Sequence, residues 1–581
     1  MSQLDWIVLI VTLLVIISYG LYKSRTSHNL DGYFLSNRSL PWGLVLLSIM
    51  GTQASAITFL SAPGQAYTDG MRFVQYYFGI PLAMVVISIS FVPIFRKLKV
   101  YTAYEYLETR FDGKTRTLTS LLFFLQRGLS TGISVFAPSI ILSSLLGWNI
   151  YWTNLFMGGL LIIYTMTGGA KAVAYTQQLQ LIIIFIGMFL AGYMVVHMLP
   201  KYVGFTDALD VSGKLQRLNV ITTGITERGF NWSDQYNIFS GVIGGFFLAL
   251  SYFGTDQSQV GRYLTAKSLQ ESRMGLLMNG IVKVPMQFFI LLIGALVFTF
   301  YQFNRAPIFF NEVQLQKIEN SEYRDSLRIV NDRYQILAEE KQEVLYNYMG
   351  AKRDHNQELS DKWITELRSL QDSSNALRSR VKYWLDKKIA GGDGNDTNYI
   401  FLRFVVDNLP VGLVGLLIAI IFLASWGSIA AAVNSLASCS MVDLHKRFTN
   451  KKETGEDEYQ LSKWYTLGWG VFCIIVAMFT YNIGNSLIEA VNILGSLFYG
   501  VILGVFLVAF FFKNIRNSHA VFWGAILAEL LVLGVFILTK LNPPVLKMGF
   551  LWLNPIGAFG VILFSLLLNA AWRERSTAGR K

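Results

Sequence analysis

Small and hydroxyl-bearing residues gather in two otherwise apolar stretches of this chain. The first is Gly51-Thr-Gln-Ala-Ser-Ala-Ile-Thr-Phe-Leu-Ser-Ala-Pro63-Gly64 and the second is Ala424-Ser-Trp-Gly-Ser-Ile-Ala-Ala-Ala-Val-Asn434. Small hard cations prefer oxygen ligands, and several converging carbonyls and hydroxyls can supply them. Backbone that is interrupted at membrane depth must line something polar, because hydrocarbon leaves its free groups unpaired. The two stretches therefore predict a cation site inside a membrane.

The candidate ligands differ between the two stretches. We expect an interruption at Pro63-Gly64 and free carbonyls near Gly51 and Ala54. In the second stretch the carbonyl of Ala424 and the hydroxyl of Ser428 share one helix face at i, i+4 spacing. Small residues also allow close helix packing in membranes, and a single such stretch would mean no more than that. Two in one chain favour the cation site.

The bulk composition is that of a polytopic membrane protein. Of 581 residues, 53% are hydrophobic and only 15% are charged. The net charge of +12 does not indicate nucleic-acid binding, because the basic residues fall in short loops between apolar runs. Two cysteines and five histidines provide neither a disulfide framework nor a metal cluster.

Hydropathy predicts about thirteen membrane-spanning helices. Their expected extents are 4–22, 42–66, 72–95, 117–146, 150–168, 175–199, 237–256, 276–303, 406–440, 463–482, 485–511, 519–539 and 550–571. The first run has no basic leader and no cleavage site and is followed by Lys23 and Arg25, so we expect a retained helix.

Charge in the loops predicts the orientation. Every second loop is basic, and Arg72, Lys201 and Lys540 are isolated cases in the alternate loops. Basic loops stay on the cytoplasmic side. We therefore expect a multi-pass protein of the plasma (cell inner) membrane with its N-terminus outside and its C-terminus in the cytoplasm.

One segment has no membrane character. From about 305 to 400 the chain is charged and helix-periodic, with Gly350 and Gly391-Gly-Asp-Gly-Asn-Asp396 as interruptions. It predicts two long amphipathic helices folded as a hairpin on the outer face. The domain organisation is then 1–304 (helices 1 to 8), 305–400 (insert) and 401–581 (helices 9 to 13). The insert is either a tolerated loop insertion or a docking surface for an unknown protein partner.

Several longer motifs carry a resemblance. They are Ala54-Ser-Ala-Ile-Thr-Phe, Phe95-Arg-Lys-Leu-Lys-Val-Tyr-Thr-Ala-Tyr-Glu-Tyr-Leu-Glu-Thr-Arg-Phe111, Tyr164-Thr-Met-Thr-Gly-Gly-Ala-Lys-Ala-Val, Gly261-Arg-Tyr-Leu-Thr-Ala-Lys-Ser and Asn434-Ser-Leu-Ala-Ser-Cys-Ser-Met-Val-Asp-Leu444. Outside the insert, the chain resembles the sodium/solute symporters, which include sodium/glucose, sodium/proline, sodium/sialic acid and sodium/iodide carriers. The region from Ile133 to Val173 looks more like the anion, monocarboxylate and vitamin branch than the sugar branch.

The resemblance implies an all-α LeuT-type fold. Two inverted five-helix repeats would be preceded by one extra helix and followed by others, with broken helices at 42–66 and 237–256. It also implies a sodium site built from the carbonyls of Gly51, Ala54 and Ala424 and from hydroxyls at the two adjacent positions Gly427 and Ser428.

This chain departs from that pattern at two places. Glycine at 427 removes one hydroxyl, so water or Ser425 completes the shell or sodium binds more weakly. A second sodium site, as some members have, would need a carboxylate near Gln177 and hydroxyls at Ala430 and Ala431. We therefore expect one sodium ion per cycle.

Solute should bind at the bilayer midplane beside the sodium ion. By position in the family, the candidate residues are Gln53, Ser55, Thr58, Gln75, Tyr76, Ser130, Ser134, Ser251, Tyr252, Phe253 and Asn492. Thr58, Tyr252 and Gln53 are the first choices. For each of them a hydrogen bond between helices is an equally good explanation.

Charged residues inside the membrane are functional candidates. Lys283 either faces the solute or snorkels or pairs with an acid. Asp256 and Arg262 are expected to form an ion pair at the cytoplasmic mouth. Arg127 has no obvious partner, and if it faces the solute it favours an anion, because Arg binds carboxylates bidentately.

The leading function is sodium-coupled import of a small polar organic solute or anion by alternating access. A sensor that binds a solute in the same fold without concentrating it is the alternative. An intramembrane enzyme is not supported, because the chain has no HExxH motif, paired intramembrane Asp or Ser/His constellation. The expected partners are a small solute, sodium and the lipid bilayer. Sugar, sialic acid, monocarboxylate, amino acid and inorganic anion all remain open as solutes.

Overall fold

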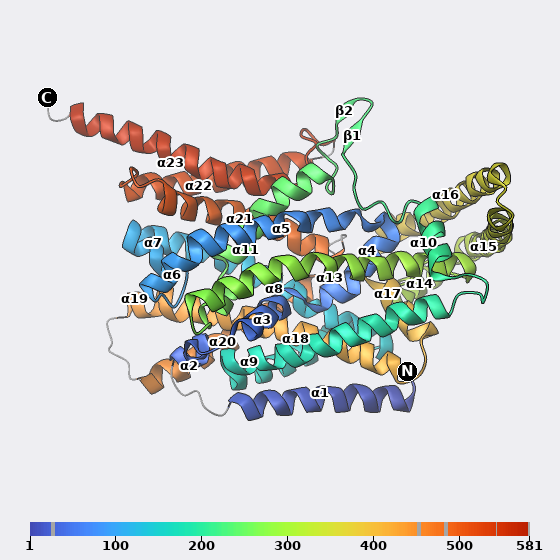
Figure 1. Cartoon of the computed structure of the whole chain (residues 1–581), viewed down its shortest axis with the longest axis horizontal. Helices are drawn as coiled ribbons and strands as arrows, with labels where there is room; N and C mark the ends of the chain where they lie inside the picture. The colour runs from blue at the N-terminus through green and yellow to red at the C-terminus, as the bar shows by residue number, and fades with distance from the viewer. Residues whose placement is uncertain (25–29, 450–454, 481–485, 542, 579–581) are drawn as a thin grey trace.

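The computed structural model describes residues 1–581 except 25–29, 450–454, 481–485, 542 and 579–581, so Arg25 lies outside the described residues. The protein is almost entirely α-helical (Figure 1). A single hairpin of two-residue strands, β1 (Ile225–Thr226) and β2 (Gly229–Phe230), is the exception to the all-α prediction in the described chain. The strands lie in an exposed loop and do not alter the fold class.

Ten helical segments of the described chain are long and apolar enough to cross a membrane. They contain α1 (Gln3–Ser24), α5 (Ile80–Val86) with its flanking turns, α8 (Gly113–Leu146), part of α9 (Ile150–His197), α13 (Leu269–Phe303), α18 (Leu413–Cys439), α20 (Gly455–Phe479), α21 (Leu487–Phe511), α22 (Ser518–Lys540) and α23 (Leu553–Ala578). One bent pair and two shorter apolar helices, Ile150–Met166 and Ser240–Thr255, accompany them. The prediction of a polytopic helical membrane protein is confirmed, whereas the count of thirteen stays a prediction.

Helix α9 combines two of the expected spans. Its 48 residues would extend about 72 Å if straight. The hydroxyls of Tyr164 and Thr176, twelve residues apart, lie 2.7 Å from each other, although a straight helix would separate the two residues by about 18 Å. The chain therefore folds back within this element. The prediction that Lys171 lies in a loop is wrong, because Lys171 is helical and the backbone stays helical where α9 folds back.

The first broken helix consists of α3 (Trp42–Gln53) and α4 (Ala56–Asp69), which meet at an angle of 61°. The break is at Ala54 and Ser55 rather than at Pro63-Gly64, which lie inside α4. A Cβ on Gly64 would lie 1.9 Å from the carbonyl oxygen of Thr397. Gly64 thus serves the close approach of α17 (Thr397–Asn408) to α4.

The second broken helix is interrupted at Asp256. Helix α11 (Gly245–Thr255) follows a π-helical turn at Ser240–Gly244, and α12 (Gln257–Leu264) begins after the break. The carboxylate of Asp256 accepts a hydrogen bond from the Ser258 amide at 2.7 Å and caps α12. The expected range of 237–256 was therefore too short, because the second half of this broken helix lies beyond it.

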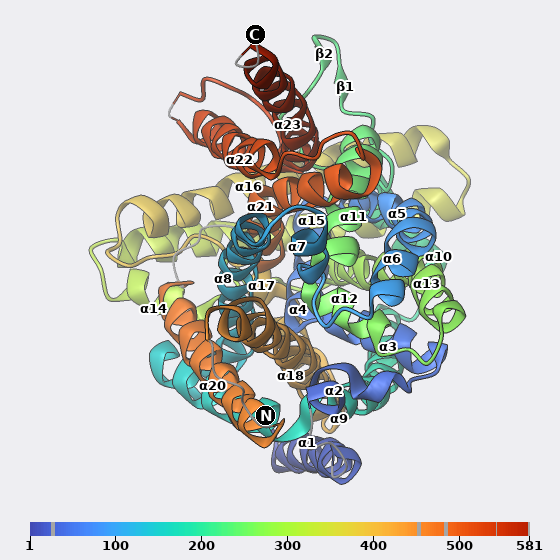
Figure 2. The same ribbon diagram turned by 90° about the vertical axis from the view of Figure 1, so that its left-hand side faces the viewer.

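The second small-residue stretch is not interrupted. It lies inside α18, all of whose residues from Leu417 to Cys439 are buried. Asp5 on α1 accepts hydrogen bonds from the amides of Gly412 (2.6 Å) and Gly415 (3.2 Å) and so anchors the start of α18. Figure 2 shows α4, α8 and α18 near the centre of the bundle and α1, α22 and α23 at its periphery.

The segment after α13 forms a helical hairpin. A short helix, α14 (Glu312–Glu319), precedes α15 (Arg324–Arg353) and α16 (Gln357–Lys387), which pack against each other. Gly350 does not interrupt α15. Tyr348 and Lys352 bond the carboxylate of Asp210 on α10 (Phe205–Lys214), at 2.6 and 3.0 Å. These contacts fix the hairpin to the helical body.

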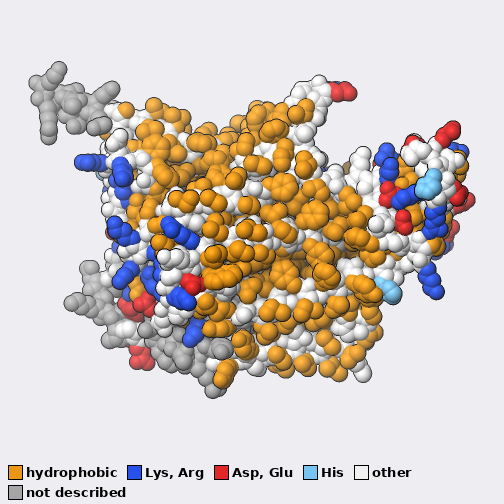
Figure 3. Space-filling view, viewed as in Figure 1, with side chains coloured by type: hydrophobic (Ala, Val, Ile, Leu, Met, Phe, Trp, Pro, Cys, Tyr) orange, Lys and Arg blue, Asp and Glu red, His pale blue; other side chains and the backbone are white. Residues whose placement is uncertain are grey.

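The surface of the body is apolar around its middle (Figure 3). Large exposed side chains such as Ile7, Leu14, Ile163, Phe189 and Leu530 face outward from peripheral helices. A soluble protein rarely exposes so much apolar surface, whereas lipid requires it. Lys and Arg gather at the end of the body opposite the α15–α16 hairpin (Figure 3).

Candidate functional site

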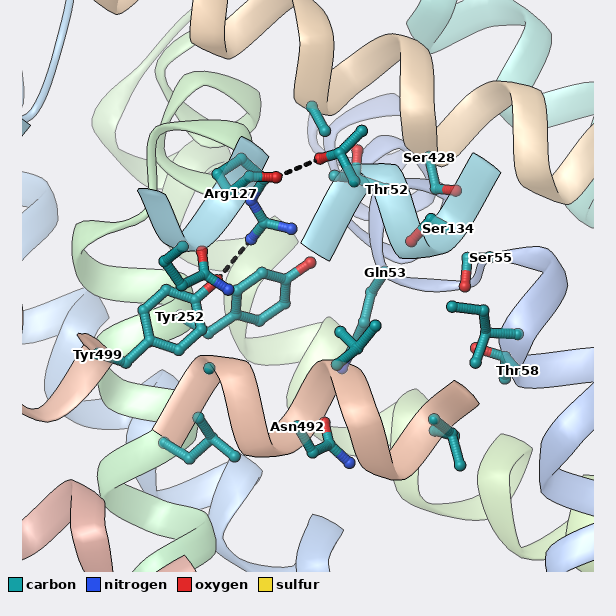
Figure 4. A pocket seen from close by; sticks show the side chains of 18 of the residues that line it. Thr52, Gln53, Ser55, Thr58, Arg127, Ser134, Tyr252, Ser428, Asn492 and Tyr499 are labelled. Carbon is teal, nitrogen blue, oxygen red and sulfur yellow. Dashed lines mark hydrogen bonds between the residues drawn. The ribbon is translucent and has the colours of Figure 1, made fainter. Parts of the chain in front are cut away.

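A central cavity lies where the two breaks and α18 meet (Figure 4). It comprises about 830 Å³ of free space, part of it open to solvent. The lining residues come from α3, the α3–α4 break, α4, α8, α11, α18 and α21, and from the turn before α5. Because α11 and α18 are buried on nearly all sides, their polar side chains must face other helices or this cavity.

Main-chain carbonyls are released at the first break. The amide of Ser55 bonds the carbonyl of Gln53 (3.1 Å) instead of the carbonyl of Gly51. Likewise the amide of Thr58 bonds Ser55 (2.9 Å) instead of Ala54. An uninterrupted helix would use the Gly51 and Ala54 carbonyls for these bonds. Both are therefore available as neutral oxygen ligands, and they stay the predicted sodium ligands.

The remaining predicted sodium ligands lie on α18. Ser428 lines the cavity, and its hydroxyl donates to the Ser425 carbonyl at 3.0 Å. Ala424 is buried one turn before Ser428. The hydroxyl of Ser425, the alternative ligand, is buried and hydrogen-bonds no other described residue.

Two glutamines of α9 fill the space around Gly427. The Gln177 amide donates to the Gly427 carbonyl (3.0 Å) and to the Thr52 hydroxyl (3.2 Å), and it accepts from Ser48 (2.8 Å). A Cβ on Gly427 would lie 2.5 Å from Oε1 of Gln180. The side-chain oxygen of Gln180 thus lies near the position that a hydroxyl at residue 427 would occupy. No sequence pattern indicated that Gln180 would lie there.

The cavity brings together about half of the predicted solute residues. Figure 4 shows Gln53, Ser55, Thr58, Ser134, Tyr252 and Asn492 around one space. The predicted residues that line it are Gln53, Ser55, Thr58, Tyr76, Ser134, Tyr252 and Asn492. They stay predictions as solute contacts.

The other predicted solute residues do not line the cavity. Gln75 bonds Thr222 and the carbonyl of Tyr236, and Ser251 donates to the carbonyl of Tyr499 at 2.6 Å. Ser130 donates to the carbonyl of Arg127 one turn earlier. Their hydroxyl and amide groups serve hydrogen bonds between or within helices.

Phe253 and Lys283 also face away from the cavity. Phe253 is buried and packs edge-on against Tyr252, with ring centroids 4.9 Å apart. The ammonium of Lys283 is buried 5.7 Å from the ring centroid of Tyr77, and no described residue hydrogen-bonds it. Tyr77 itself lines the cavity, so Lys283 lies one side chain behind its wall.

A charged cluster closes one end of the cavity. Arg127 on α8 donates through Nε to Asp256 at 2.9 Å and through Nη2 to Asp256 and to the Tyr499 hydroxyl. Tyr499 in turn donates to Asp256 at 2.6 Å, and the guanidinium lies 5.2 Å from the ring centroid of Tyr252. The cluster connects α8 and α21 to the break between α11 and α12.

This cluster overturns the expected Asp256–Arg262 pair. The Asp256 side chain is fully buried and binds Arg127, 129 residues away in sequence. Arg262 is buried in α12, and two of its guanidinium nitrogens hydrogen-bond no described residue. Arg127 does face the cavity, and among the described residues that line it Arg127 is the one charged side chain.

Sequence reasoning missed several lining residues. They are Thr52, Ile57, Tyr77, Gln126, Thr131, Leu248, Ile429, Ala432, Ile488, Val491, Gly495 and Tyr499. Spacing could have indicated Thr131, which follows Arg127 by four residues on the same face of α8 as the predicted Ser134. Tyr499 carried no such signal.

Comparison with known proteins identifies the family. The model of the sodium:solute symporter family matches residues 33–322 and 380–528. The chain belongs to the sodium:solute symporter family. The unmatched residues 323–379 coincide with most of the α15–α16 hairpin.

Two curated relatives match nearly the whole chain. The sodium/sialic acid symporter SiaT of Proteus mirabilis is 24% identical, over 96% of this chain and 93% of its own length. The sodium/sialic acid symporter NanT of Aliivibrio fischeri is also 24% identical, over 100% and 99%. This symporter is thus a sodium-coupled solute importer, and sodium is its coupling ion. Its family is one of transporters, not enzymes.

A solved structure supports the fold. The structure of a sodium-coupled sialic acid symporter, in a substrate-bound outward-open state, superimposes with a TM-score of 0.73. It covers 98% of both chains at 22% identity. The similarity shows that the two proteins share a fold, and the solute of this symporter must be argued from its own cavity.

Proposed function

We propose that this symporter imports a small organic anion carrying a carboxylate, with one sodium ion per cycle. The observation that carries the proposal is Arg127, the one charged side chain among the described residues lining the central cavity. Its Nε and Nη2 bind Asp256 and Tyr499, whereas Nη1 takes part in neither contact. The Nη1 hydrogens are the donors for a solute carboxylate.

The rest of the cavity suits a polar body on that anion. Amide and hydroxyl groups of Gln53, Ser55, Thr58, Ser134 and Asn492 line the wall away from Arg127 (Figure 4). Such groups recognise hydroxyl or amide substituents, and they reject analogues that leave them unpaired. Two relatives over nearly the full length are sialic acid symporters, so N-acetylneuraminate is the first solute to test.

A single sodium ion fits the described residues. The Gly51 and Ala54 carbonyls are released by the break, and Ser428 adds a hydroxyl beside the cavity. A second site would need a carboxylate near Gln177, whose neutral amide already bonds Ser48, Thr52 and Gly427. Alanines at 430 and 431 contribute no side-chain oxygen.

The same proposal includes the expected topology of thirteen spans in LeuT-type inverted repeats. Both interrupted helices contact α18, the first through α3 and α4 and the second through α12, which supports this topology. Basic side chains gather at the end of the body opposite the hairpin, which supports a cytoplasmic location for that end (Figure 3). The N-terminus and the hairpin of residues 305–400 would then face outward.

Uptake into proteoliposomes tests the proposal. Labelled N-acetylneuraminate, lactate, glucose and proline are compared with sodium or choline outside. A carboxylate should accumulate only with inward sodium, and neutral glucose should not. Accumulation of glucose but no carboxylate would refute the solute class. Binding without accumulation would instead favour a sensor.

The double variant Arg127→Met/Asp256→Asn tests the role of Arg127. It removes both charges of the buried pair, so neither partner is left as an isolated buried ion. Carboxylate uptake should be lost while sodium-dependent thermal stabilisation persists. Unchanged carboxylate uptake would exclude Arg127 as the anion-binding residue.

A further inference from the structure

A second cavity lies between the α15–α16 hairpin and the helical body. It comprises about 750 Å³ of free space and is bordered by the ends of α4 and α13. Four cationic side chains line it, namely Arg217, Lys341, Arg378 and Lys382. No Asp or Glu is among its described lining residues. We call it the hairpin cavity.

Two of the four cations share one buried carboxylate. Arg378 lies 2.7 Å and Lys382 3.4 Å from the buried carboxylate of Asp396. This carboxylate also accepts the Phe310 amide, and Tyr67, Tyr301 and Tyr334 provide the remaining titratable side chains of the wall. One carboxylate thus offsets one of two charges, and the cluster stays positive.

Neither of the other two cations forms an ion pair with a described carboxylate, although Arg217 is close enough to Asp69 to be attracted by its charge. The Lys341 side chain is buried at 5% exposure, and its ammonium donates to the neutral oxygen of Gln371 at 3.2 Å. The guanidinium of Arg217 lies 4.6 Å from the ring centroid of Phe298, and its buried Nε hydrogen-bonds no described residue. Buried charge of one sign is costly unless a counter-charge joins it.

The electrostatics of the hairpin cavity favour binding of a negative charge. Burial, followed by the positive charge of Arg378, lowers the pKa of Lys341 to about 8. Neutral hydrogen-bonding groups of Asn375 and Ser379, which are exposed on α16, form the rim of the cavity. The cavity therefore combines positive charge, an open rim and polar side chains, which are the properties of an anion site.

We propose that the hairpin cavity binds a small anion between Lys341 and Arg217. Tyr67 in its wall follows Thr58 of the central cavity by nine residues of α4, about 14 Å along the helix. The hairpin cavity therefore lies farther toward the hairpin end of the body. The anion is either a free inorganic ion or the carboxylate of a solute. If the anion is the solute carboxylate, the proposal rests on the proposed function, and the solute would bind in the hairpin cavity before it reaches the central cavity.

Carbamylation of Lys341 by cyanate tests the site directly in the full-length protein. Cyanate reacts with the neutral amine, so its rate reports the protonation of Lys341. An anion beside the ammonium raises its pKa, and a rise of about one unit would slow the reaction at pH 8 about fivefold. Rates are read from peptide mass spectra at constant ionic strength and constant sodium.

The arms of the experiment identify the anion. Isethionate serves as the background anion, and chloride, acetate or N-acetylneuraminate replaces part of it. Slowing by chloride indicates an inorganic ion, and slowing by the carboxylates alone indicates the solute. The same Lys341 rate with all four anions would overturn the proposal.

Variants separate this site from the central one. Arg217→Gln should abolish most of the protection, whereas Arg380→Gln, exposed on α16, should leave it unchanged. Full protection in Arg217→Gln would contradict a shared site. In Arg127→Met/Asp256→Asn, protection by acetate should persist although uptake is lost. The anion site in the hairpin cavity can therefore be confirmed even if the transported solute is not a carboxylate.

Discussion

The pairing of Arg127 with Asp256 gives the sharpest prediction about this symporter. Both side chains are nearly inaccessible, at 11% and 0% exposure, and the carboxylate also accepts from Tyr499 (2.6 Å) and from the Ser258 amide (2.7 Å). The substitution Asp256→Asn keeps the shape and an acceptor oxygen, so it removes mainly the charge. It leaves a guanidinium buried without a counter-ion.

The expected cost follows from that burial. Removing one partner of a buried ion pair lowers the free energy of unfolding by about 3–5 kcal/mol. Arg127→Met should cost a similar amount, because it isolates the carboxylate. The double variant removes both charges and should cost much less than the sum. The coupling free energy should therefore reach about 3 kcal/mol.

Unfolding by SDS in mixed micelles, monitored by tryptophan fluorescence, measures the four corners of this cycle. Arg127→Met/Ser212→Ala is a suitable control cycle, because Ser212 on α10 hydrogen-bonds the Ala295 carbonyl and the Thr299 hydroxyl rather than any member of the charged cluster. A coupling below about 0.5 kcal/mol, the range of independent sites, would refute the buried pair. The ion pair that joins α8 to the break between α11 and α12 would then contribute nothing to stability.

Three further predictions concern sodium and the hairpin. Ser428→Ala should lose the sodium-dependent rise in melting temperature, whereas Ser425→Ala, whose hydroxyl is outside the cavity lining, should retain it; the reverse would move the site. Gly427→Ser alone should destabilise the protein, because its Cβ would lie 2.5 Å from Oε1 of Gln180. The double variant Gly427→Ser/Gln180→Ala should bind sodium about fivefold more tightly than Gln180→Ala alone, because one added oxygen ligand contributes ~1 kcal/mol. Isothermal calorimetry with sodium decides this, and equal affinities would contradict it. Burial raises the pKa of Asp393 in the hairpin region to about 6, so the folded chain holds a proton that the unfolded chain releases above pH ~4. Stability should fall as pH rises through about 6, and Asp393→Asn should flatten this dependence in thermal unfolding from pH 4 to 8.

Local sequence was sufficient for the membrane architecture. An apolar run of about 20 residues crosses a bilayer whatever it packs against, so hydropathy located the ten long apolar helical segments of the described chain. The released carbonyls of Gly51 and Ala54 were expected for a similar reason, because a small, hydroxyl-rich run weakens a helix locally. The position of the break was less predictable. Gly64 is small because α17 passes it closely, and only packing shows this.

Side-chain direction required the tertiary structure. Helices buried on all sides, such as α11 and α18, carry no polar stripe to indicate which face meets the cavity. Ser251 on α11 thus resembled a solute contact, yet it bonds a neighbouring segment, as does Gln75 in the turn before α5.

The sequence alone determined that this chain is a helical sodium symporter with a charged insert, because hydropathy and short motifs are local properties. Only the tertiary structure decided that Asp256 is the partner of Arg127, that Gln180 lies beside Gly427, and that four described cations line one cavity beneath the hairpin. Each of these contacts joins residues far apart along the chain. Such distances depend on how whole helices pack, which no short window of sequence contains.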